Sequence, residues 1–87
     1  MSVRPLKLRY ASHARRRMPR RRISEAEVEE AWTSRHVTVY EPAGPRRADD
    51  VLVIRSTLTS GRRLKVIVSA DDERFVITAA DQGEEDR

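Results

Sequence analysis

The second half of the chain consists of four apolar, largely β-branched runs separated by turn residues, and this pattern limits the fold most. The runs cover residues 36–41, 50–58, 64–69 and 74–79. β-Branched residues favour strands, and Ser60–Gly61 and Asp71–Asp72 stand where hairpin turns are needed. Residues 41–49 contain two prolines and a glycine and are expected to form a loop. The four runs therefore predict an antiparallel meander.

The beginning of the chain has the pattern of a short strand followed by a short helix. Residues 6–10 alternate apolar and basic side chains, as in a half-buried strand. Ser12 is a good N-cap, and Ala14 and Met18 lie one helical turn apart, so they are expected to face the core. Pro19 cannot donate a backbone hydrogen bond and disfavours helical geometry in the residue before it. We therefore expect the helix to end or distort near residue 18.

A capping box predicts a second helix. Ser24 and Glu27 have the spacing at which each side chain bonds the backbone N–H of the other, so a helix is expected over about residues 25–34. Its apolar face would be made by Val28, Ala31 and Trp32. The glutamates of this segment are expected to line the outside of the helix. Trp32 is expected to belong to the core rather than to stack on a nucleobase.

The order of these elements indicates the fold class. With both helices before the meander, the order β-α-α-β-β-β-β predicts an α+β domain with two N-terminal helices packed on one face of an antiparallel sheet. A chain of 87 residues has the size of one small domain. Residues 1–80 are expected to form this domain, and residues 81–87 are expected to be an acidic tail that frays.

Several kinds of active site are excluded by what the sequence lacks. Cysteine is absent, so the chain has no disulfide, thiolate zinc site, iron–sulfur cluster or thiol nucleophile. No glycine-rich phosphate loop opens a helix, and no histidine–carboxylate cluster has metal-ligand spacing, so neither metal nor cofactor is expected. No apolar run reaches the roughly 20 residues of a membrane span. We expect a cytoplasmic protein that does not bind a membrane.

Basic residues are concentrated at the N-terminus. Residues 1–22 carry nine arginines and lysines and no acidic residue, whereas the net charge of the whole chain is +4. Such a block attracts polyanions, because each phosphate neutralised by arginine or lysine releases counterions. The residues expected to bind nucleic acid are Arg9, Arg15, Arg16, Arg20, Arg22 and Lys65. Alternatively, the arginines pair with the acidic segment that follows or simply face solvent.

One histidine stands in line with two arginines. His13, Arg17 and Arg21 are spaced at i, i+4 and i+8, so a continuous helix would place them along one stripe. In the first turn, the helix N-terminus and the nearby cations disfavour a proton on the imidazole. A neutral imidazole can act as a general base, and guanidinium groups stabilise charge that develops on phosphorus. These three residues are the candidate catalytic residues for metal-independent RNA cleavage.

Two questions about this constellation stay open from the residues alone. The candidates for the general acid are Tyr10, Tyr40, Lys65 and another arginine. The alternative to catalysis is a structural role for the same side chains. His13 would then cap or pack at the start of its helix, while Arg17 and Arg21 would bridge to glutamates or to the C-terminal acids.

At these residues the sequence resembles the bacterial family called domain of unknown function 4258. Its members are typified by a strand, the pattern His-Ala-x-x-Arg-Met-x-x-Arg-x-Ile-Ser, an acidic helix and closing strands with Val-Ile-Thr. This chain carries the pattern from His13 to Ser24 and the closing segment at residues 76–78. It departs from the pattern at Pro19 and at Arg22, where a glycine is common.

The family is similar in element order to the RelE-like and BrnT-like toxins, which are small basic ribonucleases blocked by an antitoxin. The resemblance implies a toxin-like endoribonuclease of a toxin–antitoxin system. Its partners would be RNA, with or without the ribosome, and a cognate antitoxin whose acidic segment covers the basic surface. The alternative is a non-catalytic module that binds nucleic acid or a protein through the same surface. Whether the protein forms a homodimer is left open.

Overall fold

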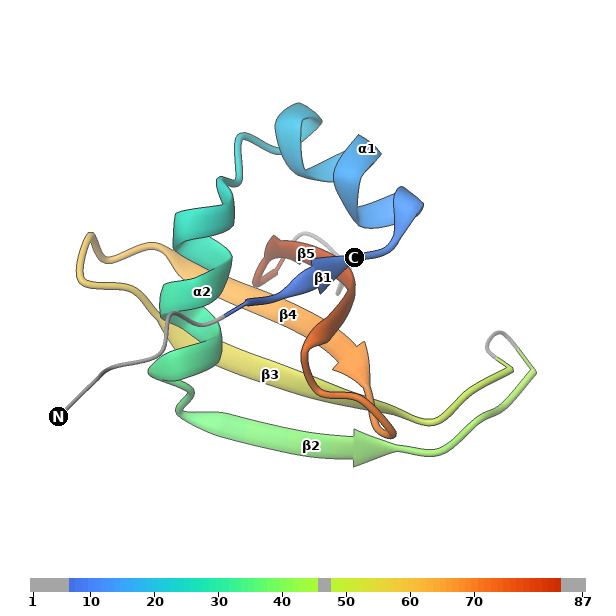
Figure 1. Ribbon diagram of the computed structural model, residues 1–87. Coiled ribbons are helices and arrows are strands. Elements are labelled where there is room, and N and C mark those ends of the chain that lie inside the picture. The colour runs from blue at the N-terminus through green and yellow to red at the C-terminus, as the bar shows by residue number, and fades with distance from the viewer. Residues whose placement is uncertain (1–6, 46–47, 84–87) are drawn as a thin grey trace, which may run out of the picture.

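Two helices and one five-stranded sheet make up the described chain, which is residues 7–45 and 48–83 of a computed structural model (Figure 1). The elements are β1 (Arg9–Tyr10), α1 (Ser12–Arg20), α2 (Glu25–Thr33), β2 (Val37–Glu41), β3 (Val51–Thr57), β4 (Arg63–Ser69) and β5 (Phe75–Asp81). The α+β class and the element order β-α-α-β-β-β-β are confirmed. Neither described helix has the length and apolarity needed to cross a membrane.

The sheet is mixed, with the strand order β1-β5-β4-β3-β2. Strands β2 to β5 form the expected antiparallel meander, whereas β1 pairs in parallel with β5 through Arg9–Phe75 and Tyr10–Val76. A fully antiparallel sheet was expected, because alternation within one segment predicts a strand but not the direction of its distant neighbour. Of the strand expected at residues 6–10, the structure describes residues 7–10 and assigns two of them to β1.

Both helices pack on one face of the sheet (Figure 1). Ala14 and Met18 of α1 and Val28 of α2 are buried in the same cluster as alternate residues of the strands. The strand residues of this cluster are Tyr10, Ile54, Leu64, Val66, Val68, Val76 and Ala79. A smaller cluster of Val51, Val53 and Ile67 belongs to the opposite face of the sheet. The apolar alternation of β3 and β4 thus supplies two cores, and the larger one fixes the position of the helices.

Helix α1 continues through Pro19 to Arg20, so the expectation that it ends or distorts near residue 18 was wrong. The backbone N–H of Arg21 still donates to the Arg17 carbonyl, with an N···O distance of 3.0 Å. Two further backbone hydrogen bonds close the helix. The N–H of Ile23 donates to the Met18 carbonyl, and the N–H of Arg22 donates to the Pro19 carbonyl. This is a Schellman motif, and it puts Arg22 at φ 56° in the left-handed region. Proline in the last turn removes one donor, while the motif satisfies the final carbonyls.

Helix α2 begins with the predicted capping box. Glu27 N donates to Ser24 Oγ over 3.1 Å, and Ser24 N donates to a Glu27 carboxylate oxygen over 3.0 Å. Further along α2, the Ala31 carbonyl accepts a hydrogen bond over 2.6 Å from the buried hydroxyl of Ser56 in β3. Trp32 is partly buried against the core, as predicted, and its Nε1 donates to the Glu73 carbonyl over 2.8 Å. Helix α2 is therefore attached to the sheet by polar as well as apolar contacts.

The end of the described chain belongs to the fold. Strand β5 runs to Asp81, and the Gln82 amide donates to the Leu64 carbonyl over 3.0 Å. These two residues had been assigned to the tail of residues 81–87, since their side chains are polar. Their polar groups are partnered within the fold, which composition alone does not indicate. Residues 84–87 of that expected tail lie outside the described residues.

Candidate nucleic-acid interface

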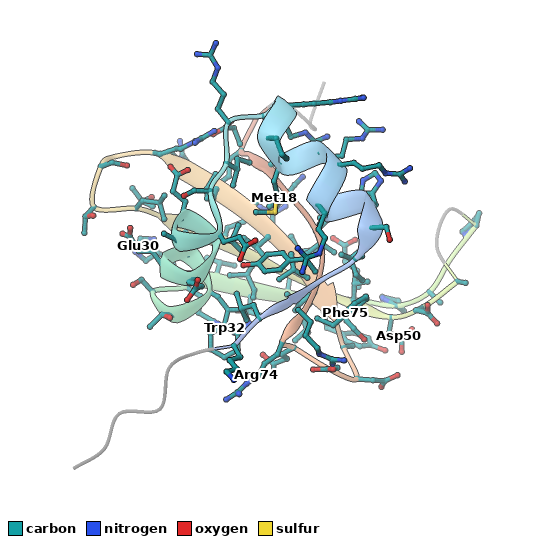
Figure 2. The ribbon with its side chains drawn as sticks, turned by 45° about the horizontal axis from the view of Figure 1, so that its top comes forward. Met18, Glu30, Trp32, Asp50, Arg74 and Phe75 are labelled. Atoms are coloured by element: carbon teal, nitrogen blue, oxygen red, sulfur yellow. The ribbon has the colours of Figure 1, made fainter. Side chains whose placement is uncertain are left out.

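Helix α1 carries basic side chains around its whole exposed surface. Ala14 and Met18 are the residues of this helix that are buried, and the helix contains no acidic residue. Its exposed arginines, here called the α1 basic face, are Arg15, Arg16, Arg17 and Arg20. Figure 2 shows nitrogen-tipped side chains that project from this helix away from the sheet. Arg22, beyond the end of the helix, is exposed as well.

The three candidate catalytic residues are only partly brought together. His13 and Arg17 are both exposed and lie one turn apart on α1, on the same side of the helix. Arg21 is partly buried, and its Nη1 donates to the Ala79 carbonyl of β5 over 2.8 Å. That carbonyl lies on β5 beyond Val76, the last β5 residue that pairs with the short strand β1. Arg21 therefore ties the end of α1 to β5 through a backbone carbonyl, whereas the structural role considered from the sequence was a bridge to glutamates or to the C-terminal acids.

Arg9 and Lys65 do not join the α1 basic face. Arg9 forms an ion pair with Asp72 and lies over the Phe75 ring, with its guanidinium carbon 5.6 Å from the ring centroid. Lys65 is 8% exposed, and it alternates with Leu64 and Val66, which face the helices. Its side chain is thus on the sheet face away from α1. The expectation that Lys65 lies on the nucleic-acid-binding surface does not agree with this burial.

None of the three named candidates for the general acid lies beside His13. Tyr40 is in β2, which Figure 1 shows at the edge of the sheet farthest from α1. The Tyr40 hydroxyl donates to the Asp50 carboxylate. Lys65 is on the sheet face away from α1, as described above. Tyr10 contacts the other side of α1, where the Arg15 guanidinium lies over its ring, 5.7 Å from the centroid. On an α-helix, Arg15 and His13 flank the buried stripe on opposite sides.

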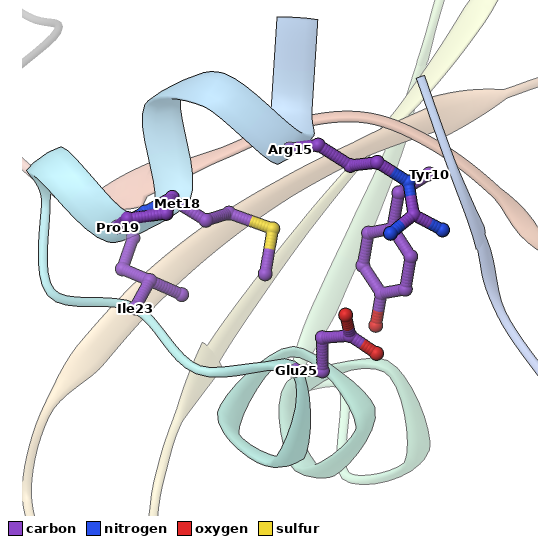
Figure 3. A pocket seen from close by; sticks show the side chains of 6 residues that line it. All are labelled: Tyr10, Arg15, Met18, Pro19, Ile23 and Glu25. Carbon is purple, nitrogen blue, oxygen red and sulfur yellow. The ribbon is translucent and has the colours of Figure 1, made fainter. Parts of the chain in front are cut away.

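Between α1 and α2 lies a pocket with a volume of about 180 Å³, shown in Figure 3 and here called the Tyr10 pocket. It is lined by Tyr10, Arg15, Met18, Pro19, Ile23 and Glu25. The Tyr10 side chain is buried, and its hydroxyl has no hydrogen-bond partner among the described residues. Figure 3 shows this hydroxyl pointing toward the Glu25 carboxylate. The sequence analysis did not find this pocket, because its walls come from separate elements.

The Tyr10 hydroxyl keeps its proton at neutral pH. Burial contributes most and, with the negative charges of Glu25 and Glu29, raises the pKa of Tyr10 to about 12, while Arg15 opposes them. A buried phenol that stays neutral is a hydrogen-bond donor. The carboxylate of Glu25 is an acceptor only. The pocket thus presents one donor next to two acceptor oxygens.

The relative position of α1 and α2 is held by Arg62, a residue that the sequence analysis did not single out. Its guanidinium bonds both oxygens of Asp81, at 2.6 and 2.9 Å, and Glu27 at 3.1 Å. It also donates to the carbonyls of Arg21 at 2.9 Å and Arg22 at 2.7 Å. The hydrogen bond from Arg62 lowers the pKa of Asp81. For Glu27, the backbone N–H of Ser24 contributes most to a lowered pKa, and Arg62 adds to it.

Comparisons with known proteins identify the family. Among the described residues, no group of three or more histidines and carboxylates is placed to hold a metal ion. Neither a curated protein nor a solved structure matches this chain. A family model, described as a domain of unknown function (DUF4258), matches residues 10–81, which is most of the chain. The pattern from His13 to Ser24 that suggested this family lies within the matched region. The chain therefore belongs to the DUF4258 family.

Proposed function

We propose that this protein binds RNA through the α1 basic face. The observation that carries the proposal is the exposure of all four arginines on a helix that has no acidic residue. None of the four forms an ion pair with an acidic residue in the described part of the chain. Within the N-terminal basic block, internal charge pairing thus applies to Arg9, which pairs with Asp72, but not to the four arginines of this face.

An arginine side chain binds a phosphate group with more defined geometry than a lysine side chain does. The planar guanidinium donates two parallel hydrogen bonds to one phosphate, and it remains charged at every physiological pH. The four arginines surround one short helix, so that several consecutive phosphates can be bound together. The similarity in element order to RelE-like and BrnT-like toxins favours RNA over DNA as the ligand.

A second candidate function is cleavage of the bound RNA by a toxin-like, metal-independent endoribonuclease. It is favoured by one observation, the exposure of His13 one turn from Arg17. In this reaction His13 would accept the proton of the ribose 2′-hydroxyl as its oxygen bonds phosphorus, and Arg17 would stabilise the charge on the phosphorane oxygens. The bond from phosphorus to the 5′-oxygen would then break, and the leaving 5′-oxygen would take a proton from water. Arg21, held by the Ala79 carbonyl, would position the end of α1. An antitoxin with an acidic segment would inhibit the protein by covering the α1 basic face.

The binding proposal is tested by the salt dependence of RNA affinity. Fluorescence anisotropy with a labelled single-stranded RNA would be recorded over a series of KCl concentrations. The slope of log K against log salt is negative, and each lost phosphate contact lowers its magnitude by about 0.7, so Arg16→Ala combined with Arg17→Ala should lower the magnitude by about 1.4. Arg74→Ala is the matched control, because Arg74 is exposed and lies away from α1 (Figure 2). Equal slopes for the double variant and the control would refute the proposal.

The cleavage proposal is tested with the same RNA in the presence of EDTA. Wild-type protein should cut the RNA, His13→Ala should abolish the cut, and Arg17→Lys should slow it strongly, since lysine keeps the charge but loses the planar fork. Circular dichroism checks that each variant is folded. RNA that is bound but remains intact would overturn the nuclease and leave the binding function standing.

A further inference from the structure

The Tyr10 pocket contains a buried hydroxyl that the protein itself does not satisfy. The Tyr10 side chain is 8% exposed, and its oxygen has no partner among the described residues. An unpaired buried donor destabilises a protein, and such groups are rare in folded chains. Tyr10 lines the pocket, so a group that enters beside it can accept this hydrogen bond once the side chains that cover the hydroxyl move aside.

The size and lining of the pocket limit what can enter. About 180 Å³ is smaller than the roughly 300–1,000 Å³ of sites for drug-sized ligands, so the pocket fits one ring system or one side chain. Met18, Pro19 and Ile23 offer apolar contact to a flat ring, and the Arg15 guanidinium lies at the ring of Tyr10. The polar contacts come from the Tyr10 hydroxyl and the Glu25 carboxylate, which Figure 3 shows facing each other.

The carboxylates near the Tyr10 hydroxyl disfavour a phosphate group at that hydroxyl but suit the edge of a base. Glu25 lines the pocket, and Glu25 and Glu29 act on the Tyr10 hydroxyl through their negative charge. Two carboxylates repel an anion, so the phosphates of a bound strand would stay on the arginines of α1. Arg16 and Arg20 are exposed next to the pocket residues Arg15 and Pro19 on the same helix.

We propose that the Tyr10 pocket binds one unstacked guanine base of the RNA held by the α1 basic face. The Watson–Crick edge of guanine presents the O6 acceptor next to the N1–H and N2–H donors. The Tyr10 hydroxyl donates to O6, and the two oxygens of Glu25 accept from N1–H and N2–H. The Watson–Crick edges of adenine, cytosine and uracil lack two adjacent N–H donors, so none of them can donate to both oxygens of Glu25. Unstacked bases are commonly held in this way against arginine or apolar surfaces. This inference rests on the proposed RNA binding.

The test compares four oligouridine RNAs of equal length that differ in one central base. Anisotropy at one KCl concentration should show that the RNA with guanine binds about tenfold more tightly than those with adenine, cytosine or uracil, the size expected for a bidentate contact. Glu25→Gln and Tyr10→Phe should each reduce this preference to less than about threefold. Glu29→Gln is the matched control, because it removes the same charge from α2 but is not a pocket residue; it should keep the preference.

The outcomes separate this inference from the function on which it rests. Binding of all four RNAs with one affinity, unchanged by Glu25→Gln, overturns the guanine site and leaves RNA binding intact. Absence of binding to any RNA overturns the proposed function. A second measurement does not depend on α1 binding a strand: GMP added to ¹⁵N-labelled protein should shift the amide signals of Tyr10, Ile23 and Glu25. AMP at the same concentration should not shift them, and equal shifts with both nucleotides count against the guanine site.

Discussion

Replacing Arg62 with alanine is expected to destabilise the fold more than any other single change to a surface charge. The side chain is 24% exposed and makes close contacts with Asp81, Glu27 and the carbonyls of residues 21 and 22. Its loss removes the Arg62 donor from Asp81 and from the two carbonyls, while Glu27 keeps its hydrogen bonds from Ser24. Hydrogen bonds to charged groups contribute roughly 1.5–3 kcal/mol each, and water replaces part of this at a partly exposed site. The expected loss in the free energy of unfolding is about 3 kcal/mol.

Urea unfolding followed by circular dichroism measures this loss. For a domain of this size, about 3 kcal/mol corresponds to a decrease of roughly 12–24 °C in Tm. Arg62→Lys should lose about half as much, because an ammonium group cannot bond Asp81 and the two carbonyls at the same time. Arg63→Ala is the control, since Arg63 is the exposed neighbour and should change stability by less than about 0.5 kcal/mol.

Acidification gives an independent check on the same network. The pKa values of Asp81 and Glu27 are lowered in the folded state, so their stabilisation is present above the unfolded pKa of roughly 4 and is lost as the pH falls through the folded values. Without Arg62 the pKa of Asp81 rises again, and the variant loses less stability on acidification. The gap between wild type and Arg62→Ala should therefore narrow from pH 7 to pH 2. A gap that stays constant over this range, or a loss below about 1 kcal/mol at pH 7, would refute the reasoning.

Three further changes have defined expectations. Tyr10→Phe should leave the free energy of unfolding unchanged or raise it by up to about 1 kcal/mol in urea unfolding, because it removes an unpaired buried hydroxyl; a clear loss would show that the hydroxyl is satisfied. Arg22→Gly should raise Tm by about 4–8 °C in a thermal scan. At φ 56° arginine bears a backbone strain of about 1 kcal/mol, which glycine does not; a lower Tm contradicts this. Ser56→Ala should reduce stability by about 1–2 kcal/mol, since the Ala31 carbonyl loses a buried donor at 2.6 Å, and an unchanged urea midpoint would contradict that role.

The parts of the fold that local sequence encodes were predicted well. The box of Ser24 and Glu27 fixed the start of α2, and the β-branched runs with their turns predicted the meander from β2 to β5. Pro19 was misleading because burial of Met18 and the closing turn at Arg22 keep the last turn of α1 helical in spite of one missing donor. Local propensity was overridden there by tertiary packing.

The parts that depend on distant contacts were not predicted. The direction of β1 is set by its pairing with β5, more than sixty residues later in the chain. In the candidate site, the exposed arginines of α1 followed from helical spacing, but the role of Arg21 depends on the Ala79 carbonyl. The Tyr10 pocket requires α1, α2 and β1 together, and Arg62 reaches Glu27 across 35 positions. Charge and spacing within one segment carry no information about such partners.

The parallel pairing of β1 with β5 has a consequence for synthesis of the protein. Strand β1 cannot pair until β5 has been synthesised, because Phe75 and Val76 leave the ribosome only after strands β2 to β4. The same late segment supplies Ala79 and Asp81, which receive Arg21 and Arg62. A nascent chain cut short before β5 thus lacks the Ala79 carbonyl that accepts from Arg21 and the Asp81 carboxylate that pairs with Arg62. The β5 segment must therefore be synthesised before the arginine-bearing helix reaches its final position on the sheet.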